Sequence, residues 1–211
     1  MKQIFSFFTA IILLSSCSND KAKTDGDAAV VKSATAETAA PDSATMMKNW
    51  MAYMTPGAEH KMMASWDGEW KAEITMWMSP EAPPTKTVGT TVNKTIFDGR
   101  YQQSAHKGSW DGQPFEGMST LAYDNAKKVF ISTWIDNMGT GVMVGEGPWD
   151  EATKSISLRG KMVDPSSHKE VEFREVYKVV DENNQVMEMY APVPGGKGEF
   201  RTMEIKYTRS K

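Results

Sequence analysis

The chain has 211 residues, with 24 basic and 27 acidic side chains and a formal net charge of −3. This balance excludes the basic footprint of a protein that binds nucleic acid, or that binds an anionic membrane surface by charge. The single cysteine excludes an intramolecular disulfide and a metal site built from several thiolates, so the stability of the fold must come from its core.

The N-terminal segment has the layout of an export signal. A positive charge at Lys2 precedes an apolar run over residues 4–14, which is shorter than the roughly 20 residues that span a bilayer. The sequence Leu14-Ser15-Ser16-Cys17 follows it and resembles the lipobox of bacterial lipoproteins. The resemblance implies that residues 1–16 are a signal peptide and that acylated Cys17 attaches the chain to membrane lipid. We therefore expect a lipid-anchored protein of the bacterial cell envelope, facing either the periplasm or the cell surface.

A tether is predicted next. Residues 17–45 are mostly Ala, Ser, Thr, Asp and Lys, and such a segment cannot bury enough surface to offset the entropy of ordering it. The composition changes at Met46, after which all seven tryptophans and all six tyrosines occur. We interpret residues 17–45 as the lipidated cysteine with a disordered tether, and residues 46–211 as one domain.

The domain begins with a helical pattern and continues with strands. Residues 46–54 and 58–64 are predicted to be short helices, separated by Pro56-Gly57. From Trp70 onward apolar and polar residues alternate with period two, and turn dipeptides recur at roughly 10–12-residue spacing. About ten strands follow, with no room for crossover helices. The pattern predicts an all-β fold: an antiparallel up-and-down β-barrel with helix confined to about residues 46–65.

The first strand carries a family signature. Gly68-Glu69-Trp70 resembles the Gly-x-Trp motif of the calycin superfamily, which includes lipocalins and fatty-acid-binding proteins. The resemblance implies that Trp70 closes one end of the barrel and that a basic residue from the last strand packs over its ring. Arg209 is the first candidate for that residue, and Arg201 is the second.

A longer series of motifs extends over nearly all of residues 46–211. In chain order they include Pro56-Gly57-x-x-His60, Gly68-x-Trp70, Trp77-x-x-Pro80, Asp98-Gly99-Arg100-Tyr101, Gly112-x-Pro114-Phe115-x-Gly117, Trp134-x-Asp136, Asp164-Pro165 and Met203-Glu204. On these motifs the chain resembles domain-of-unknown-function family 1579, a calycin-like bacterial family with no established activity. The resemblance implies a fold and leaves the function open.

Charged and aromatic residues within the apolar strands are the candidate ligand-binding groups. They are Trp134, Asp136, Arg174, Glu188 and Tyr190. An unpaired ion in a low-dielectric interior costs several kcal/mol, so buried members of this set must pair. We predict that Asp136, Arg174 and Glu188 face one cavity, where Arg174 grips the head group of an acidic apolar ligand. The alternative is a structural ion pair or a set of outward-facing charges.

His60 is a further candidate, and its alternative is a capping or packing role in the helical segment. No metal or cofactor is expected, because none of the three histidines has a His or Cys at ligand spacing. Haem-binding calycins place the ligand near the C-terminus, where this chain has no histidine. The glycines at 141, 145 and 147 lie in a strand pattern, which favours close strand packing over phosphate binding.

The leading hypothesis is a non-enzymatic lipoprotein whose barrel binds a small hydrophobic ligand. The 16 methionines suit an adaptable apolar pocket, although ordinary core filling explains most of them. One alternative is an enzyme in which an inward-facing Asp136 or Glu188 acts as acid or base. Another is a structural or interaction lipoprotein whose barrel is filled by its own side chains. The sequence does not determine the oligomeric state.

Overall fold

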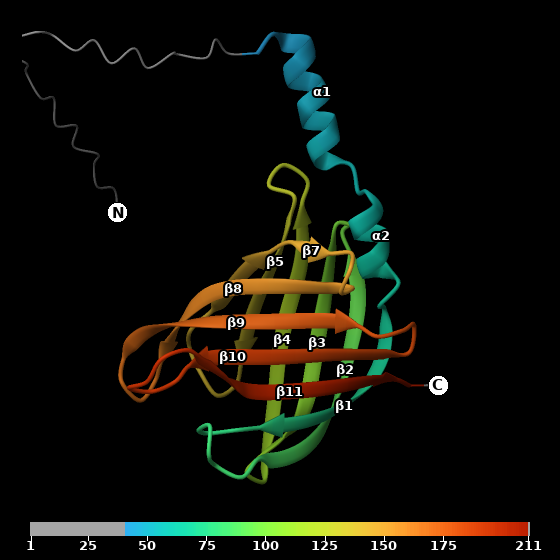
Figure 1. Ribbon diagram of the computed structural model, residues 1–211. Coiled ribbons are helices and arrows are strands. Elements are labelled where there is room, and N and C mark those ends of the chain that lie inside the picture. Colours follow the sequence, from blue (N-terminus) through green and yellow to red (C-terminus); the bar gives the residue numbers. More distant parts are fainter. Residues whose placement is uncertain (1–40, 211) are drawn as a thin grey trace, which may run out of the picture. The chain divides into compact units, whose positions relative to one another are not determined.

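The structure is a computed structural model that describes residues 41–210 (Figure 1). The predicted signal peptide, the lipidation site Cys17 and most of the predicted tether lie outside the described residues. Within the described part, no helix is both long enough and apolar enough to cross a membrane.

Two helices open the described chain: α1 spans Ser43–Met54 and α2 spans Ala58–Ala64. Helix α1 begins three residues before the predicted start, inside the segment interpreted as tether. The reason is the N-cap Asp42, whose side chain accepts hydrogen bonds from the backbone N–H groups of Ala44 and Thr45 at 2.9 and 3.0 Å. No residue of α1 is buried. Near its C-terminal end, Asn125 Nδ2 donates to the carbonyls of Ala52, Tyr53 and Thr55.

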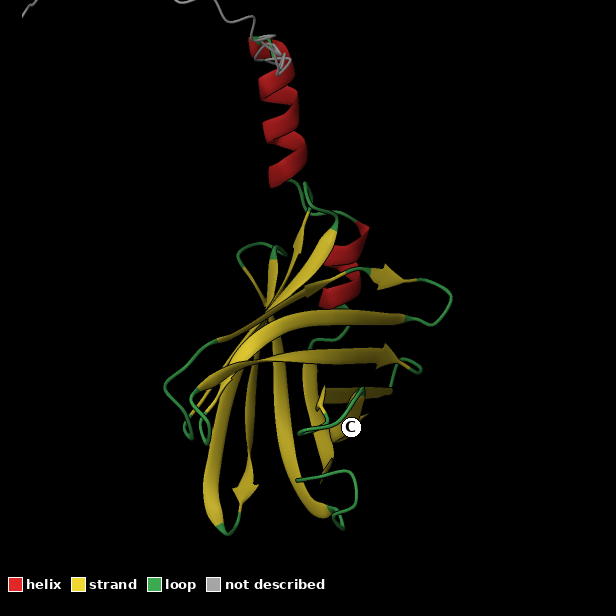
Figure 2. Ribbon diagram, turned by 60° about the vertical axis from the view of Figure 1, so that its left-hand side comes forward, coloured by secondary structure: helices red, strands yellow, loops and turns green. Residues whose placement is uncertain are grey.

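The strands form a closed barrel. They are β1 (Gly68–Met76), β2 (Thr85–Ile96), β3 (Tyr101–Trp110), β4 (Gln113–Asp124), β5 (Val129–Asp136), β6 (Met143–Gly147), β7 (Trp149–Asp150), β8 (Ser155–Asp164), β9 (Lys169–Val179), β10 (Asn184–Pro192) and β11 (Glu199–Arg209). All pairs are antiparallel, β1 pairs with β11, and β6 pairs with β8 to close the ring beside the two-residue β7. Figure 2 shows the strands curving round a common interior. The predicted antiparallel barrel of about ten strands is confirmed.

Glycines make the closure possible. A Cβ on Gly147 would lie 1.8 Å from the carbonyl oxygen of Ser157, and one on Gly160 would lie 2.1 Å from that of Val144. Any larger residue would push β6 and β8 apart. Close strand packing is therefore the role of Gly147.

One end of the barrel is packed solid. Trp70 is 1% exposed, and its indole Nε1 donates to the carbonyl of Trp66 at 2.9 Å. The Arg209 guanidinium carbon lies 4.3 Å from the centroid of the Trp70 ring. Arg209 also donates to the carbonyls of Asp67 and Ser65 at 2.6 and 2.8 Å, just beyond the end of α2. The structure thus has the arrangement that the Gly-x-Trp resemblance implies.

Two details complete this end. A Cβ on Gly68 would lie 3.2 Å from the Arg209 Nη1, so the glycine of the motif leaves room for the guanidinium. Arg201, the second candidate, lies elsewhere, with its guanidinium carbon 4.6 Å from the centroid of Trp77. Helix α2 supplies Met63, which is 1% exposed, to the same packed core.

Candidate ligand-binding cavity

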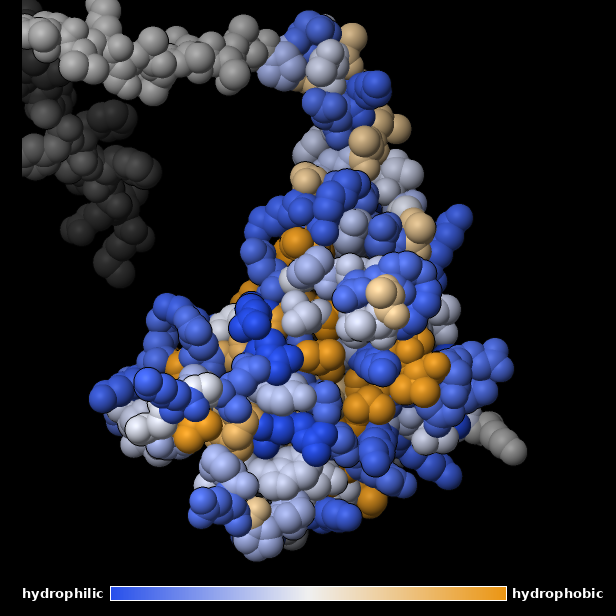
Figure 3. Space-filling model, viewed as in Figure 1, coloured by the Kyte–Doolittle hydropathy of each residue, from blue (hydrophilic) through white to orange (hydrophobic). Residues whose placement is uncertain are grey.

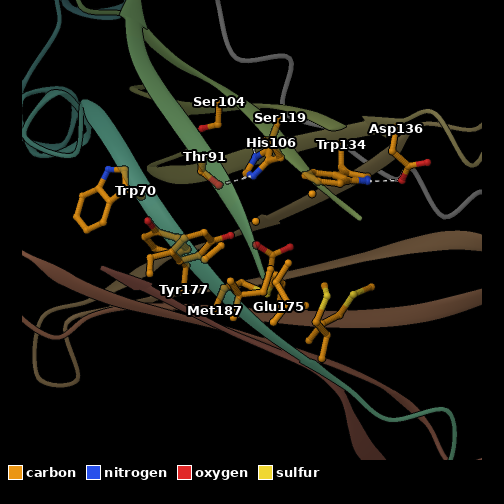
Figure 4. Close-up of a pocket in the computed structure, with 18 of the residues that line it drawn as sticks. Trp70, Thr91, Ser104, His106, Ser119, Trp134, Asp136, Glu175, Tyr177 and Met187 are labelled. Carbon is orange, nitrogen blue, oxygen red and sulfur yellow. Dashed lines mark hydrogen bonds between the residues drawn. The ribbon is translucent and has the colours of Figure 1, made fainter. Parts of the chain in front are cut away.

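The rest of the barrel interior is hollow. A cavity of about 490 Å³ extends from Trp66 and Trp70 at the packed end to Trp110 and Met138 toward the other end (Figure 4). Ligand sites in proteins commonly occupy roughly 300–1,000 Å³. The barrel is therefore not filled by its own side chains in its described part.

The cavity has two unlike walls. Strands β2 to β5 contribute four hydroxyl side chains, Thr91, Ser104, Ser119 and Ser132, among larger residues such as Leu121 and Trp134. Strands β1 and β8 to β11 contribute mostly apolar side chains: Ile74, Met76, Ile156, Leu158, Met187, Met189, Met203 and Ile205. Three of the methionines are direct cross-strand neighbours, because Met203 is in register with both Met76 and Met189. A bound molecule would meet most of the hydroxyl groups on one side and most of the thioethers on the other.

His106 organises the polar wall. Its Nδ1 lies 2.9 Å from Thr91 Oγ1 and its Nε2 lies 3.3 Å from Ser119 Oγ. Burial lowers the pKa of His106 to about 4, so the ring is neutral at physiological pH. The imidazole centroid lies 4.9 Å from that of Trp134. His106 was not among the predicted site residues; the alternation of Gln102, Ser104 and His106 on one strand face was the available signal.

Trp134 and Asp136 both line the cavity. Trp134 Nε1 donates to Asp136 Oδ2 at 2.7 Å, and Asp136 Oδ1 accepts the backbone N–H groups of Met138 and Gly139 at 2.9 and 3.1 Å. The Trp134 indole fits because Gly117 has no side chain. A Cβ at position 117 would lie only 2.6 Å from the indole ring. The Asp136 carboxylate therefore fixes Trp134 and the turn after β5 and has three partners of its own.

The other predicted head-group residues do not join them. Arg174 pairs with Glu199, and its guanidinium carbon lies 3.8 Å from the centroid of Tyr190. The Tyr190 hydroxyl donates to Glu188 at 3.0 Å, and Arg201 donates to Glu188 at 2.6 Å. None of these residues lines the cavity. The prediction that Arg174 and Glu188 share a cavity with Asp136 is wrong, and Tyr190 does not line that cavity either.

The physical reason is strand alternation. Strand β9 turns Phe173, Glu175 and Tyr177 toward the interior, so Arg174 projects from the outer face. Figure 3, which views the side of the molecule where β8 to β11 lie, shows hydrophilic residues interspersed with hydrophobic ones. When only the sequence is known, a mixed outer face of this kind resembles an inner face that carries a few charges.

His60 lies in α2 and is 5% exposed. Its Nδ1 accepts a hydrogen bond from the backbone N–H of Gly57 at 3.0 Å, and its ring meets Tyr123 edge-to-face with centroids 5.8 Å apart. Burial lowers the pKa of His60. It does not line the cavity. The capping and packing role given as its alternative describes its position.

Glu175 is a second cavity residue that sequence reasoning missed. It lies between Leu158 of β8 and Met189 of β10 in register, and it lines the cavity. Figure 4 shows its carboxyl group pointing into the interior. Burial alone raises the pKa of Glu175 to about 7. The signal was the spacing Phe173, Glu175, Tyr177, which places a carboxyl on the same strand face as two aromatic rings.

Comparisons with known proteins agree with this architecture. Residues 55–209 match the model of the family described as "Protein of unknown function (DUF1579)". A search of curated proteins finds no match. The chain is similar to the crystal structure of Rv2717c from M. tuberculosis, with a TM-score of 0.55 and 13% identity, over 74% of this chain and 100% of that one. It is also similar to the S-type phycobiliprotein lyase CPES from Guillardia theta, with a TM-score of 0.53 and 11% identity, over 77% and 97% of the two chains. At these identities the likeness shows a shared barrel fold.

Proposed function

Because the chain belongs to the DUF1579 family, whose description assigns no activity, we propose a function from the cavity itself: the barrel binds a small hydrophobic ligand. The observation that supports this proposal is the hollow of about 490 Å³, one wall of which is mostly aliphatic and thioether side chains. The free energy of binding is favourable when an apolar molecule covers such walls, because apolar surface on both partners is removed from water.

The gain is large enough for specific binding. A ligand that buries on the order of 250 Å² of apolar surface recovers about 6 kcal/mol at roughly 25 cal/mol per Å². Additional contacts with the opposite wall have to offset the entropy lost on binding. Methionine side chains adjust to the shape of the guest, which suits a pocket that takes more than one related molecule.

A location at the membrane is the second part of the proposal. The lipobox-like Leu14-Ser15-Ser16-Cys17 supports anchoring through acylated Cys17 in the bacterial cell envelope. A Cys17→Ala chain should leave the membrane fraction, because its remaining charge does not favour an anionic surface. Retention of the variant in that fraction, with the leader removed, would contradict lipid anchoring.

Native mass spectrometry of the protein purified from its own host tests the binding. We expect an extra mass that is released on denaturation. Nile red, a neutral apolar dye, provides a second measurement by its fluorescence in the cavity. The matched control is Ser119→Trp, which narrows the cavity from the polar wall and should weaken both signals while the far-ultraviolet spectrum stays that of a β-barrel. Absence of any bound mass together with absence of dye binding would reject the proposal.

Acid–base catalysis is the second candidate function, and one observation favours it. The pKa of Glu175 is about 7, near the value that suits a general acid or base at neutral pH. Asp136 and Glu188 were the residues first considered for this role. Asp136 already accepts three hydrogen bonds, and Glu188 lies on the outer face, where it accepts from Tyr190. Incubation of the recovered ligand with the protein separates the two functions: an unchanged ligand indicates binding, and a new product mass indicates catalysis.

A further inference from the structure

The two carboxyl groups in the described cavity wall differ in their partners. Asp136 accepts one side-chain and two backbone hydrogen bonds. For Glu175, burial is the whole cause of the raised pKa, and no group among residues 41–210 donates a hydrogen bond to its carboxyl. The Glu175 side chain is half-buried and faces the cavity, and an ionised carboxyl in such an apolar wall is destabilised unless something pairs with it.

The neighbours of Glu175 do not supply that pairing. Leu158 and Met189 flank it on the adjacent strands, and Phe173 precedes it on the same strand face. The hydroxyl of Tyr177 donates to Gln185 Oε1 instead. The pKa of Tyr207 is raised, chiefly by burial and also by the Glu175 charge, so this phenol stays neutral.

Nor does the described cavity wall hold a positive side chain. His106 is neutral, since burial lowers its pKa to about 4. Lys107 borders the cavity but places its ammonium 3.3 Å from Glu116, where both side chains are exposed. Arg174, the next residue to Glu175 in the chain, pairs with Glu199 on the outer face. The ionisable groups of the described cavity wall that are left to set its charge are therefore the two carboxyl groups, Glu175 and Asp136.

Resting on the proposed binding function, we infer that Glu175 selects apolar ligands that carry an amine and rejects apolar carboxylates. An ammonium group beside Glu175 donates a charge-assisted hydrogen bond to a carboxylate that otherwise has no partner. A carboxylate in the same place meets a like charge and no cation. The inferred ligand is therefore positively charged, whereas the prediction based on Arg174 was a negatively charged, acidic ligand.

The pairing depends on the protonation of Glu175. Below a pH of about 7 the free carboxyl is protonated and offers an amine only a neutral hydrogen bond. His106 on the facing wall stays neutral down to about pH 4, and Asp136 already has its three partners. The preference for an amine should therefore weaken as the pH falls through 7.

Displacement of Nile red by three ligands of equal chain length tests the inference. They are decylamine, decanol and decanoate, added below their micelle concentrations at about pH 8 to the full-length Cys17→Ala chain, which lacks acyl groups that would compete for the cavity. We expect decylamine to bind about tenfold or more tightly than decanoate, as a charge-assisted hydrogen bond implies. Glu175→Gln should remove this preference and leave decanol binding within about threefold.

Arg174→Met is the matched control, because it removes the neighbouring charge on the outer face and should leave all three affinities unchanged. Decanoate binding as tightly as decylamine, or a preference that survives Glu175→Gln, would overturn the inference while decanol binding still supported the cavity. Failure of Nile red and all three ligands to bind would overturn the proposed function, and this inference with it.

Discussion

The packed end of the barrel and its hollow part are built from the same strands, yet they differ in the partners of a charged side chain that each contains, Arg209 in the first and Glu175 in the second. At the packed end, Trp70 and Arg209 have partners for their donors, and both lie against the end of α2. In the hollow part, Glu175 on β9 has no partner among the described residues. The first region is arranged for stability, and the second leaves an interaction for another molecule to make.

Side-chain size explains the difference in packing. At the packed end, two tryptophans and Met63 from α2 fill the barrel cross-section. In the hollow part, several inward positions of β2 to β5 carry small side chains, as at Gly89, Ser104 and Ser119. Small side chains on one wall cannot reach the other wall, so a space remains between them.

Loss of Trp70 should have the largest effect. Trp70→Ala removes a fully buried indole, and we expect the free energy of unfolding to fall by about 3–5 kcal/mol. Trp110→Ala at the other end of the cavity, where the ring is 39% exposed, should cost less than about 1 kcal/mol. Denaturant unfolding measures both. Equal losses would show that the two ends are not packed differently.

Glu175→Gln should stabilise the barrel at alkaline pH. The folded pKa of about 7 lies above the ordinary value of 4.5, so the folded state binds the proton more tightly than the unfolded state. The wild type therefore loses stability as pH rises from about 4.5 to 7 and regains none above it. We expect the variant to be more stable by roughly 2–3 kcal/mol at about pH 8 and equal near pH 4.

His106 is present in both proteins, so its own titration cancels from that difference. Unfolding curves of the two proteins across this pH range provide the measurement. A constant difference at every pH would mean that Glu175 is not held in an apolar wall, and the contrast between the two regions would fail.

Arg209→Met tests the polar part of the packed end. The change leaves the carbonyls of Ser65, Asp67 and Glu182 without their guanidinium donor, and we expect a cost of about 2 kcal/mol. Arg209→Lys should recover little of this, because an ammonium cannot both stack on Trp70 and reach three carbonyls. Full recovery by lysine would reduce the role of Arg209 to its charge alone.

Arg174→Met should have the smallest effect. Its partner Glu199 is 41% exposed in its side chain, and an ion pair of this kind contributes about 1 kcal/mol or less. We expect little change in thermal unfolding or in Nile red binding. A marked loss of dye binding would instead place Arg174 in the site, as the sequence first indicated.

Local patterns were enough for the secondary structure and for one tertiary contact. Turn dipeptides and period-two alternation predicted the strands, because both act over a few residues. The Gly68-x-Trp70 motif predicted the partnership with Arg209, although these residues are far apart in the chain, because a family resemblance carries such contacts. Trp134 and Asp136 were also found, being two residues apart on one strand face.

The site itself was only partly predictable. Arg174 and Glu175 are adjacent, and the spacing of Glu175 from Phe173 and Tyr177 is a weak signal beside the apolar residues around both, so alternation alone does not decide which of them faces inward. A register shift between Met189 and Tyr190 complicates the next strand in the same way. A step of one residue exchanges the two faces of a strand, and with them the charge of the cavity.

By itself, then, the sequence determined the order of the elements, the antiparallel barrel and the plug at Trp70, since these depend on local periodicity, turn chemistry and a recognisable motif. Only the tertiary structure decided which face of each strand became the interior. Closure of β6 onto β8 turns one face of every strand inward at once, and that choice puts Glu175 in the cavity and Arg174 outside it.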